Sequence, residues 1–208
     1  KDDNTIVQPV NYIAKYDVPT QTYSSLATND INNIVRALCM YQNYVPTQIA
    51  DLYIGGDFTK YGSTTANYLM KYNALPGVVT DYFSIVGTNN LNGPVYTLEV
   101  VHDYIYIGGV FTSPYKYITR YNVQTNSFEP VSSYLLTSPV YSLHWDLSSY
   151  LYIGCDLSVA NNYLFRYDID NNLMLSMGVA SKGLNTVNQK INSIVTSTNK
   201  DVYISGNF

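Results

Sequence analysis

One short sequence pattern occurs four times in the chain and constrains its fold more than any other feature. It is a strand rich in tyrosine and isoleucine that ends in a pair of small residues. Its copies are Asp51-Leu-Tyr-Ile-Gly-Gly-Asp-Phe-Thr59, Asp103-Tyr-Ile-Tyr-Ile-Gly-Gly-Val-Phe-Thr112, Tyr150-Leu-Tyr-Ile-Gly-Cys-Asp-Leu-Ser158 and Asp201-Val-Tyr-Ile-Ser-Gly-Asn-Phe208. They recur about every 50 residues, a period typical of repeated supersecondary units. The chain is therefore expected to be a repeat protein.

Each repeat divides into four short strands, of which the pattern above is the second. The first strand reads Val-x-x-Leu, with copies at 35–38, 95–98, 140–143 and 191–194. The third ends in a basic residue, a tyrosine and Asn or Asp, with copies at 12–17, 68–73, 117–122 and 163–168. The fourth carries an apolar residue seven positions after that tyrosine, at Tyr23, Phe128 and Met174, or Tyr82-Phe83 in the second copy. Short β-branched and aromatic runs separated by polar turns predict antiparallel strands.

The second strand is apolar at nearly every position, which indicates a strand that is buried on both faces of its sheet. A four-stranded sheet stacked between two others is a propeller blade. We therefore predict an all-β chain, a β-propeller of four-stranded antiparallel blades. Residues 1–208 would form one domain of four blades, or a segment of a longer propeller.

The repeat also resembles a known family. A glycine pair after a strand, then Tyr-Asp or Tyr-Asn, then a large apolar residue seven further on resembles the kelch repeat. The Gly-Gly-x-Phe-Thr form is similar to that of galactose-oxidase-type and cortical-marker propellers. The chain departs from the usual fourth-strand tryptophan, with Tyr23, Phe128 or Met174 in its place. The resemblance implies a propeller but little about activity, because propellers have many functions.

The order of the strands suggests how such a propeller would close. Residues 12–26 contain a third and a fourth strand, and residues 191–206 contain a first and a second strand. Antiparallel pairing of residues 12–16 with residues 202–206 would complete a blade and cover both sheet edges. Two alternatives stay open, a longer parent propeller and self-assembly through pairing of the half-blades between molecules.

Composition excludes several classes of partner. Charged residues make up 12% of the chain and the net charge is -4, which is no footprint for nucleic acid. No apolar run approaches the length that membrane insertion requires. Cys39 and Cys155 do not form a disulfide framework, and Cys155 is expected to be a buried thiol. The chain contains no Asn-x-Ser/Thr sequon. For location we have only a hypothesis, a cell-surface, extracellular or virion-surface protein.

Nothing in the sequence predicts an enzyme or a cofactor. A galactose-oxidase-type copper site needs two histidines, and His102 and His144 follow their strand leucines at different offsets. Convergence on one metal is therefore not expected. The basic residues of the third strands recur in every repeat, which favours a structural contact within each blade. The recurring residues are Lys15, Lys71, Arg120 and Arg166.

Recognition is expected in the loops, because loops on a repeat scaffold carry binding residues. The loops at 57–67, 110–116 and 156–162 should share one face with the segments 84–94, 132–139 and 176–190, since strands alternate in direction. An insertion at 39–50 should extend a hairpin. The candidate binding residues are Tyr44, Asp57, Tyr61, Tyr115 and Asn161.

The favoured function is therefore a non-enzymatic binding or structural propeller that presents Tyr- and Asn-rich loops to another protein. Tyrosine offers a large contact area at low entropic cost. The alternative is a carbohydrate-binding module whose exposed tyrosines stack on sugar rings. A kelch-type copper oxidase is the third and weakest reading.

Overall fold

The computed structural model describes residues 12–26, 31–43, 49–73, 82–88, 91–156, 163–177 and 190–207. Every regular element within these ranges is a β-strand, and the strands pair antiparallel. A helix long and apolar enough to cross a membrane is absent from the described residues. The all-β prediction is confirmed.

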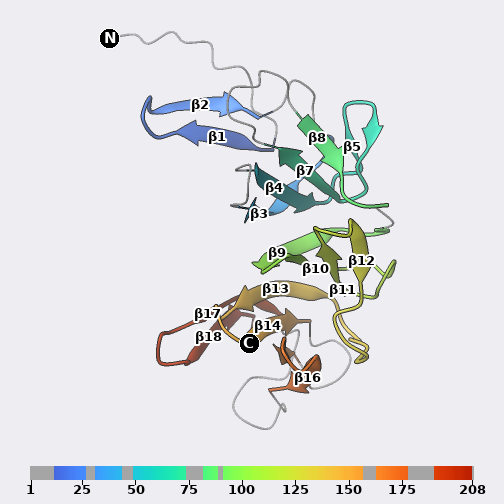
Figure 1. The fold of residues 1–208 in the computed structure, drawn as a ribbon, viewed down its shortest axis with the longest axis vertical. Coiled ribbons are helices and arrows are strands. Elements are labelled where there is room, and N and C mark those ends of the chain that lie inside the picture. Colours follow the sequence, from blue (N-terminus) through green and yellow to red (C-terminus); the bar gives the residue numbers. More distant parts are fainter. Residues whose placement is uncertain are drawn as a thin grey trace.

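Three four-stranded sheets form the body of the molecule, and each runs through its strands in chain order (Figure 1). The first sheet contains β3 (Val35–Asn43), β4 (Ile49–Gly56), β7 (Leu69–Asn73) and β8 (Tyr82–Ile85). The second contains β9 (Val95–Val101), β10 (Tyr104–Gly109), β11 (Ile118–Asn122) and β12 (Ser127–Glu129). The third contains β13 (Val140–Trp145), β14 (Tyr150–Cys155), β15 (Leu164–Asp168) and β16 (Leu173–Ser176).

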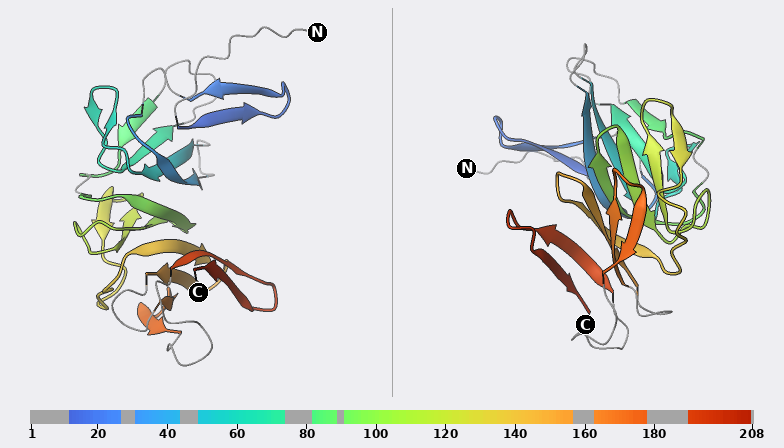
Figure 2. Two further views of the ribbon diagram at one scale, coloured as in Figure 1. Left: turned by 180° about the vertical axis from the view of Figure 1, so that it is seen from behind. Right: turned by 60° about the horizontal axis from the view of Figure 1, so that its bottom comes forward.

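Three two-stranded sheets accompany them. β1 (Ala14–Asp17) pairs with β2 (Thr22–Ser25) at one end of the stack, and β17 (Ile191–Thr196) pairs with β18 (Val202–Gly206) at the other (Figures 1 and 2). β5 (Lys60–Tyr61) and β6 (Thr64–Thr65) form a small hairpin in the loop after β4. The predicted extension of the 39–50 hairpin is confirmed, because β3 and β4 pair as far as Asn43 and Ile49.

The sheets stack in an open arc in which the first strands lie next to one another. β9 lies between β3 and β13, and β13 lies between β9 and β17. We call these four strands, β3, β9, β13 and β17, the inner strands. They define the surface on which the candidate site is built.

The second strands of the three complete sheets are buried on both faces, as predicted. In β10, Tyr106 packs into a core shared with the third sheet, whereas Ile105 and Ile107 pack into a core shared with the first. Tyr53, Tyr106 and Tyr152 occupy the same register position, opposite the basic residues of the third strands. All three tyrosine side chains are buried.

The burial predicted for every second strand is wrong for that of the fourth repeat. Tyr203 is 59% exposed. Its strand, β18, pairs only with β17 among the described residues. Without a third strand beside it and another sheet against it, a tyrosine at this position keeps its solvent contact.

The predicted closure within one chain is also absent. β1 pairs with β2 and β18 pairs with β17, and no pairing joins residues 12–16 to residues 202–206 in the described structure. The two-stranded sheets β1–β2 and β17–β18, which we call the half-sheets, lie at opposite ends of the arc (Figure 2). Counting strands predicted four blades, but three stacked sheets do not curve enough to bring the two half-sheets together.

Glycine sets the distance between neighbouring sheets. A Cβ atom added to Gly55 would lie 2.5 Å from Cγ1 of Val95, and one added to Gly108 would lie 2.5 Å from Cγ1 of Val140. A Cβ atom on Gly154 would lie 2.6 Å from Cγ2 of Ile191. In the three complete sheets, the second strand therefore touches the next inner strand through a glycine position that leaves no space for a Cβ atom.

The recurring basic residues make contacts within their own sheets. The Lys71 ammonium forms an ion pair of 2.8 Å with Asp51 on the neighbouring strand. At the same position, the Arg120 guanidinium lies 4.4 Å from the ring centre of Tyr104, and Arg166 lies 4.3 Å from that of Tyr150. These contacts support the structural interpretation of the repeated cations.

The two thiols also behave as expected. Cys39 and Cys155 are both free, and Cys155 is buried in the core between the second and third sheets. Burial raises the pKa of each thiol to about 12. Both are therefore weak nucleophiles at neutral pH.

The close approach of the sheets predicts a specific mutational coupling. We expect Gly108→Ala to destabilise the protein by about 2 to 4 kcal/mol, because the new methyl group overlaps Val140 and Thr97. Adding Val140→Ala removes one of the overlapping groups. In chemical denaturation, the double variant should therefore lose less free energy of unfolding than the two single variants together, by about 1 kcal/mol or more. Additive effects would contradict the contact.

A buried acid on an inner strand predicts pH-dependent stability. Burial raises the pKa of Glu99 to about 7, while a hydrogen bond from the Trp145 amide acts in the opposite direction. The folded protein thus binds this proton more tightly than the unfolded chain. The resulting stabilisation is complete below about pH 4.3 and is lost as pH rises through 7. In urea denaturation, Glu99→Gln should lose less stability than the wild type between about pH 5 and pH 8; parallel profiles would disprove this.

Candidate functional site

A β-bulge recurs at the same place in all four inner strands. In β3 the pairing with β4 steps from Val35 to Ala37 and skips Arg36. The corresponding residues skipped in β9, β13 and β17 are Tyr96, Tyr141 and Asn192. A bulge turns the extra residue away from the regular ladder, and bulges are common beside functional sites.

The geometry of the strand ends fixes these bulges. The residue after each second strand donates its backbone N–H to the carbonyl just before the inner strand, as Asp57 does to Ile34 at 2.8 Å. The same bond joins Val110 to Pro94, Asp156 to Pro139 and Asn207 to Lys190. In the first two sheets, a Cβ atom on the second glycine of the pair would lie 2.1 Å from that carbonyl oxygen. These glycines are therefore required by the close approach of neighbouring backbone and not by a positive φ.

The four bulged residues line one cleft with a volume of about 520 Å³. Ile34, Val35 and Lys190 complete its described lining. A second depression of about 310 Å³ continues along the same strands. The described lining contains two cationic side chains and no acidic one, in a protein whose net charge is negative.

The cleft side chains form a continuous stack along the inner strands. The Arg36 guanidinium lies 5.0 Å from the ring centre of Tyr96, and the rings of Tyr96 and Tyr141 are stacked with their centres 4.9 Å apart. The Lys190 ammonium lies 3.8 Å from the centre of the Tyr141 ring. Because β9 and β13 are each flanked on both sides, each tyrosine ring has neighbours against both faces. The ring edges and hydroxyl groups, rather than the ring faces, are therefore presented to a ligand.

Asp57 holds the first member of this stack in place. Its two carboxylate oxygens accept hydrogen bonds of 2.6 Å from Nε and Nη2 of Arg36. This hydrogen bond to Asp57 raises the pKa of Arg36, so the guanidinium stays charged. Burial raises the pKa of Tyr141, with a smaller contribution from Tyr96, so its hydroxyl stays protonated and can donate. The cleft is consequently rich in hydrogen-bond donors.

The structure places the predicted site residues in different environments. Asp57 lies behind the cleft and positions Arg36. Tyr61 stacks on Phe83 with ring centres 4.3 Å apart and packs against the first sheet's core. Tyr115 is exposed in its loop and is not among the cleft residues. Tyr44 and Asn161 lie outside the described residues.

The prediction about a shared face is confirmed where the structure describes it. Asn92 donates to Thr112 and accepts hydrogen bonds from the amides of Thr112 and Ser113. Asp156 forms a bridge with Lys190 in the third sheet. Loops that follow second strands therefore meet the segments that precede inner strands, and the cleft opens at this end of the sheets. Its lining comes from the bulges rather than from loop tips.

The sequence signal for the cleft is weak but visible. Arg36, Tyr96, Tyr141 and Asn192 all occupy the first variable position of the Val-x-x-Leu strand. Variation at one position of a regular repeat can mark a binding surface. However, the sequence does not reveal the bulge, and without it this position is predicted to be an ordinary alternating position of a strand. Asp57 is predictable as a site residue because it follows the glycine pair.

The two histidines do not form a common site. The His102 ring lies edge-on to Trp145, with ring centres 5.1 Å apart. His144 instead contacts Thr196 of β17, with Nε2 at 3.1 Å from the backbone amide and 3.0 Å from the hydroxyl. Burial lowers the pKa of His144. Within the described ranges, no group of three or more His, Cys, Asp or Glu side chains is placed to hold a metal ion.

A scan of the sequence against protein-family models finds no matching family, and a search of curated proteins finds no similar sequence.

Tyr61 and Tyr115 allow packing to be separated from recognition. We expect Tyr61→Ala to destabilise the protein by about 2 to 4 kcal/mol, because it removes a ring stacked on Phe83. Tyr115→Ala should change stability by less than about 0.5 kcal/mol, because the side chain is exposed. Thermal and urea denaturation would check both. Equal effects of the two substitutions would refute the packing role of Tyr61.

Proposed function

We propose that this chain is a non-catalytic binding domain, a segment of a kelch-like β-propeller, that holds an acidic segment of another protein in the inner-strand cleft. The propeller class is supported by three stacked four-stranded sheets with equal registers and neighbouring inner strands.

One observation carries the functional proposal. Four aligned bulges bring Arg36, Tyr96, Tyr141 and Asn192 into a single cleft. A contact needed only for stability would not have to place variable, polar side chains at equivalent positions facing solvent. Repeat proteins commonly use such concave surfaces to bind other proteins.

The chemistry of the cleft favours an acceptor-rich and negatively charged ligand. Arg36 uses Nε and Nη2 for Asp57 and keeps further N–H donors, and Lys190 adds an ammonium group at the other end of the stack. Arginine and tyrosine are enriched at the centres of protein interfaces. Asp and Glu side chains or peptide carbonyl groups would match these donors.

The same geometry weighs against the carbohydrate alternative at this site. Sugar rings stack on free aromatic faces, and the faces of Tyr96 and Tyr141 are occupied by each other and by the two cations. A glycan would be limited to hydrogen bonds at the ring edges. A protein segment with carboxylate side chains uses the cleft more fully.

A peptide-binding measurement tests the proposal. Fluorescein-labelled twelve-residue peptides of repeating Gly-Ser-Glu, Gly-Ser-Gln and Gly-Ser-Lys would be titrated by fluorescence anisotropy. We expect the Glu peptide to bind at least about tenfold more tightly than the other two, and added salt to weaken binding. Equal affinity for the three peptides would overturn the proposal, as would binding only to neutral glycans on an array.

Matched variants locate the binding. Lys190→Gln should weaken binding of the Glu peptide about tenfold, because it removes a cleft cation. Lys116→Gln is the control, because Lys116 also lies over a tyrosine ring, at 4.8 Å from Tyr117, but does not line the cleft. Equal losses in the two variants would show that binding is not in the cleft.

A further inference from the structure

We propose that the half-sheets β17–β18 and β1–β2 are the two halves of one four-stranded sheet, which is completed between two copies of this chain. The edge of β18 in one copy pairs antiparallel with the edge of β1 in the next. This inference rests on strand register and side-chain pairing, not on the ligand of the cleft.

The three complete sheets supply the template for this pairing. Their second and third strands share one register, in which Tyr53 lies opposite Lys71, Tyr106 opposite Arg120 and Tyr152 opposite Arg166. Transferring this register to the half-sheets places Tyr203 opposite Lys15, Val202 opposite Tyr16 and Ile204 opposite Ala14. The inner-strand bulge is already present in the β17–β18 pair, so this half has the same shape as in a complete sheet.

A second feature identifies the two halves as partners. The basic residue of each third strand contacts the residue two positions before the second-strand tyrosine. Lysine there forms an ion pair with aspartate, Lys71 with Asp51, whereas arginine packs over tyrosine in the other two sheets. The half-sheets carry Lys15 and Asp201 at these positions. They therefore reproduce the lysine–aspartate combination, and their charges are complementary.

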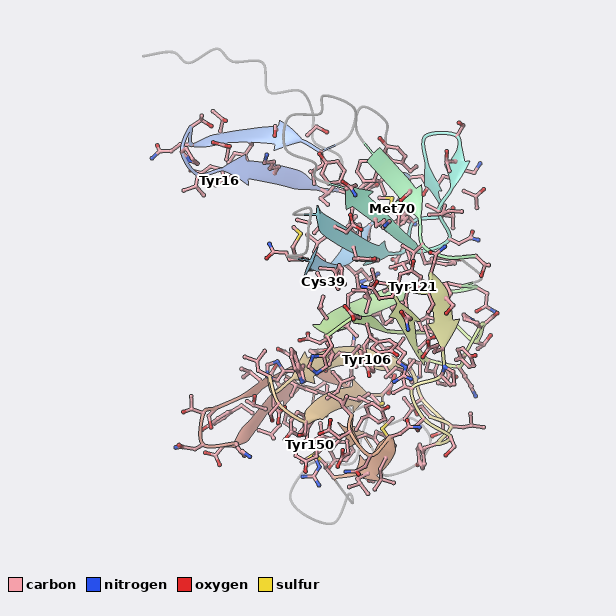
Figure 3. All side chains as sticks on the ribbon, in the orientation of Figure 1. Tyr16, Cys39, Met70, Tyr106, Tyr121 and Tyr150 are labelled. Carbon is pink, nitrogen blue, oxygen red and sulfur yellow. The ribbon has the colours of Figure 1, made fainter. Side chains whose placement is uncertain are left out.

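The half-sheets also expose tyrosine side chains at positions that are buried in a complete sheet. Tyr203 is 59% exposed and Tyr16 is 47% exposed, whereas their counterparts in the second sheet, Tyr106 and Tyr121, are buried (Tyr16, Tyr106 and Tyr121 are labelled in Figure 3). Tyr23, on β2, is also exposed. Unpaired strand edges with exposed aromatic side chains are surfaces that proteins cover.

The positions of the two edges favour a second copy as the partner. β1–β2 and β17–β18 lie at opposite ends of the arc, so they do not meet within the chain as it is folded (Figure 2). Each copy offers one edge of each kind, and the contact is head-to-tail. Two copies would contribute three complete sheets each and share two completed ones. The smallest closed assembly is then a ring of about eight sheets, a size that propellers reach.

Disulfide trapping tests the pairing. Tyr16→Cys and Val202→Cys place thiols directly opposite in the transferred register, at a separation that a disulfide can span. Mixing the two single variants with oxidised glutathione should give a covalent dimer at least about tenfold faster than mixing Tyr16→Cys with Asn199→Cys. Asn199 lies in the exposed turn between β17 and β18. The native thiols compete poorly because burial raises their pKa to about 12.

The double variant distinguishes a second copy from closure within the chain. Tyr16→Cys/Val202→Cys should give covalent dimers or longer species on a non-reducing gel. A monomer of increased mobility would show closure within one chain and overturn the proposal. Failure to crosslink any faster than the Asn199 control would overturn it as well.

Charge reversal provides an independent measurement without cysteines. Lys15→Asp alone and Asp201→Lys alone should each weaken self-association at least about tenfold in sedimentation velocity, and the double reversal in one chain should restore it. Lys116→Asp is the control and should leave association unchanged. Monomeric wild type at high concentration, or no rescue by the double reversal, would refute the pairing of β18 with β1. The comparison of the Glu, Gln and Lys peptides tests the cleft separately, because it is made on the same chain.

Discussion

The close contact between a glycine and a β-branched side chain is the constraint on which the rest of this structure depends. Gly55, Gly108 and Gly154 each face a Val or Ile of the next inner strand at a distance that leaves no space for a Cβ atom. This contact brings the second strand of one sheet against the first strand of the next. The two faces of the second strand can then fill two separate cores. In β10, Tyr106 packs into one core and the isoleucines on the other face pack into the second. In the three complete sheets, the period of the sequence is thus the period of this contact.

The inner-strand bulge follows from the same strand end. The residue after each second strand binds a carbonyl that lies just before the inner strand, and the inner strand must accommodate one extra residue to regain its register. The extra residue is freed from the demands of the ladder and of the core. Its identity can therefore vary between repeats while its direction is fixed by the backbone. The backbone contact that stabilises each strand end therefore also creates a row of positions that are available for recognition.

The sequence predicted what the repeat controls and missed what depends on geometry between repeats. The strands and the burial of Tyr53, Tyr106 and Tyr152 follow from local patterns, because an apolar strand without alternation is covered on both faces. Closure could not be predicted, because the curvature of the arc arises from packing between sheets and not from the number of strands. The exposure of Tyr203 has the same cause.

The candidate site was only partly predictable for a related reason. Asp57 was identified because its position after the glycine pair is fixed in the repeat, but its role, to orient Arg36, depends on a contact between β3 and the end of β4. Tyr61 looked like a loop residue, yet the β5–β6 hairpin places its ring on Phe83. A tyrosine in a polar loop sequence can serve either role, and only tertiary packing distinguishes them.

The half-sheet and the cleft are physically linked through β17. Asn192 lines the cleft and lies on the same strand whose partner, β18, has an edge without a described neighbour. Lys190, the residue just before this strand, completes the stack over Tyr141. A two-stranded sheet has little independent stability, and a third strand with its packed side chains reduces its motion. Pairing of β18 with β1 of another copy would therefore stiffen one wall of the cleft and lower the entropic cost of binding there. Assembly and ligand binding would favour each other, and by linkage the coupling free energy must be the same in both directions.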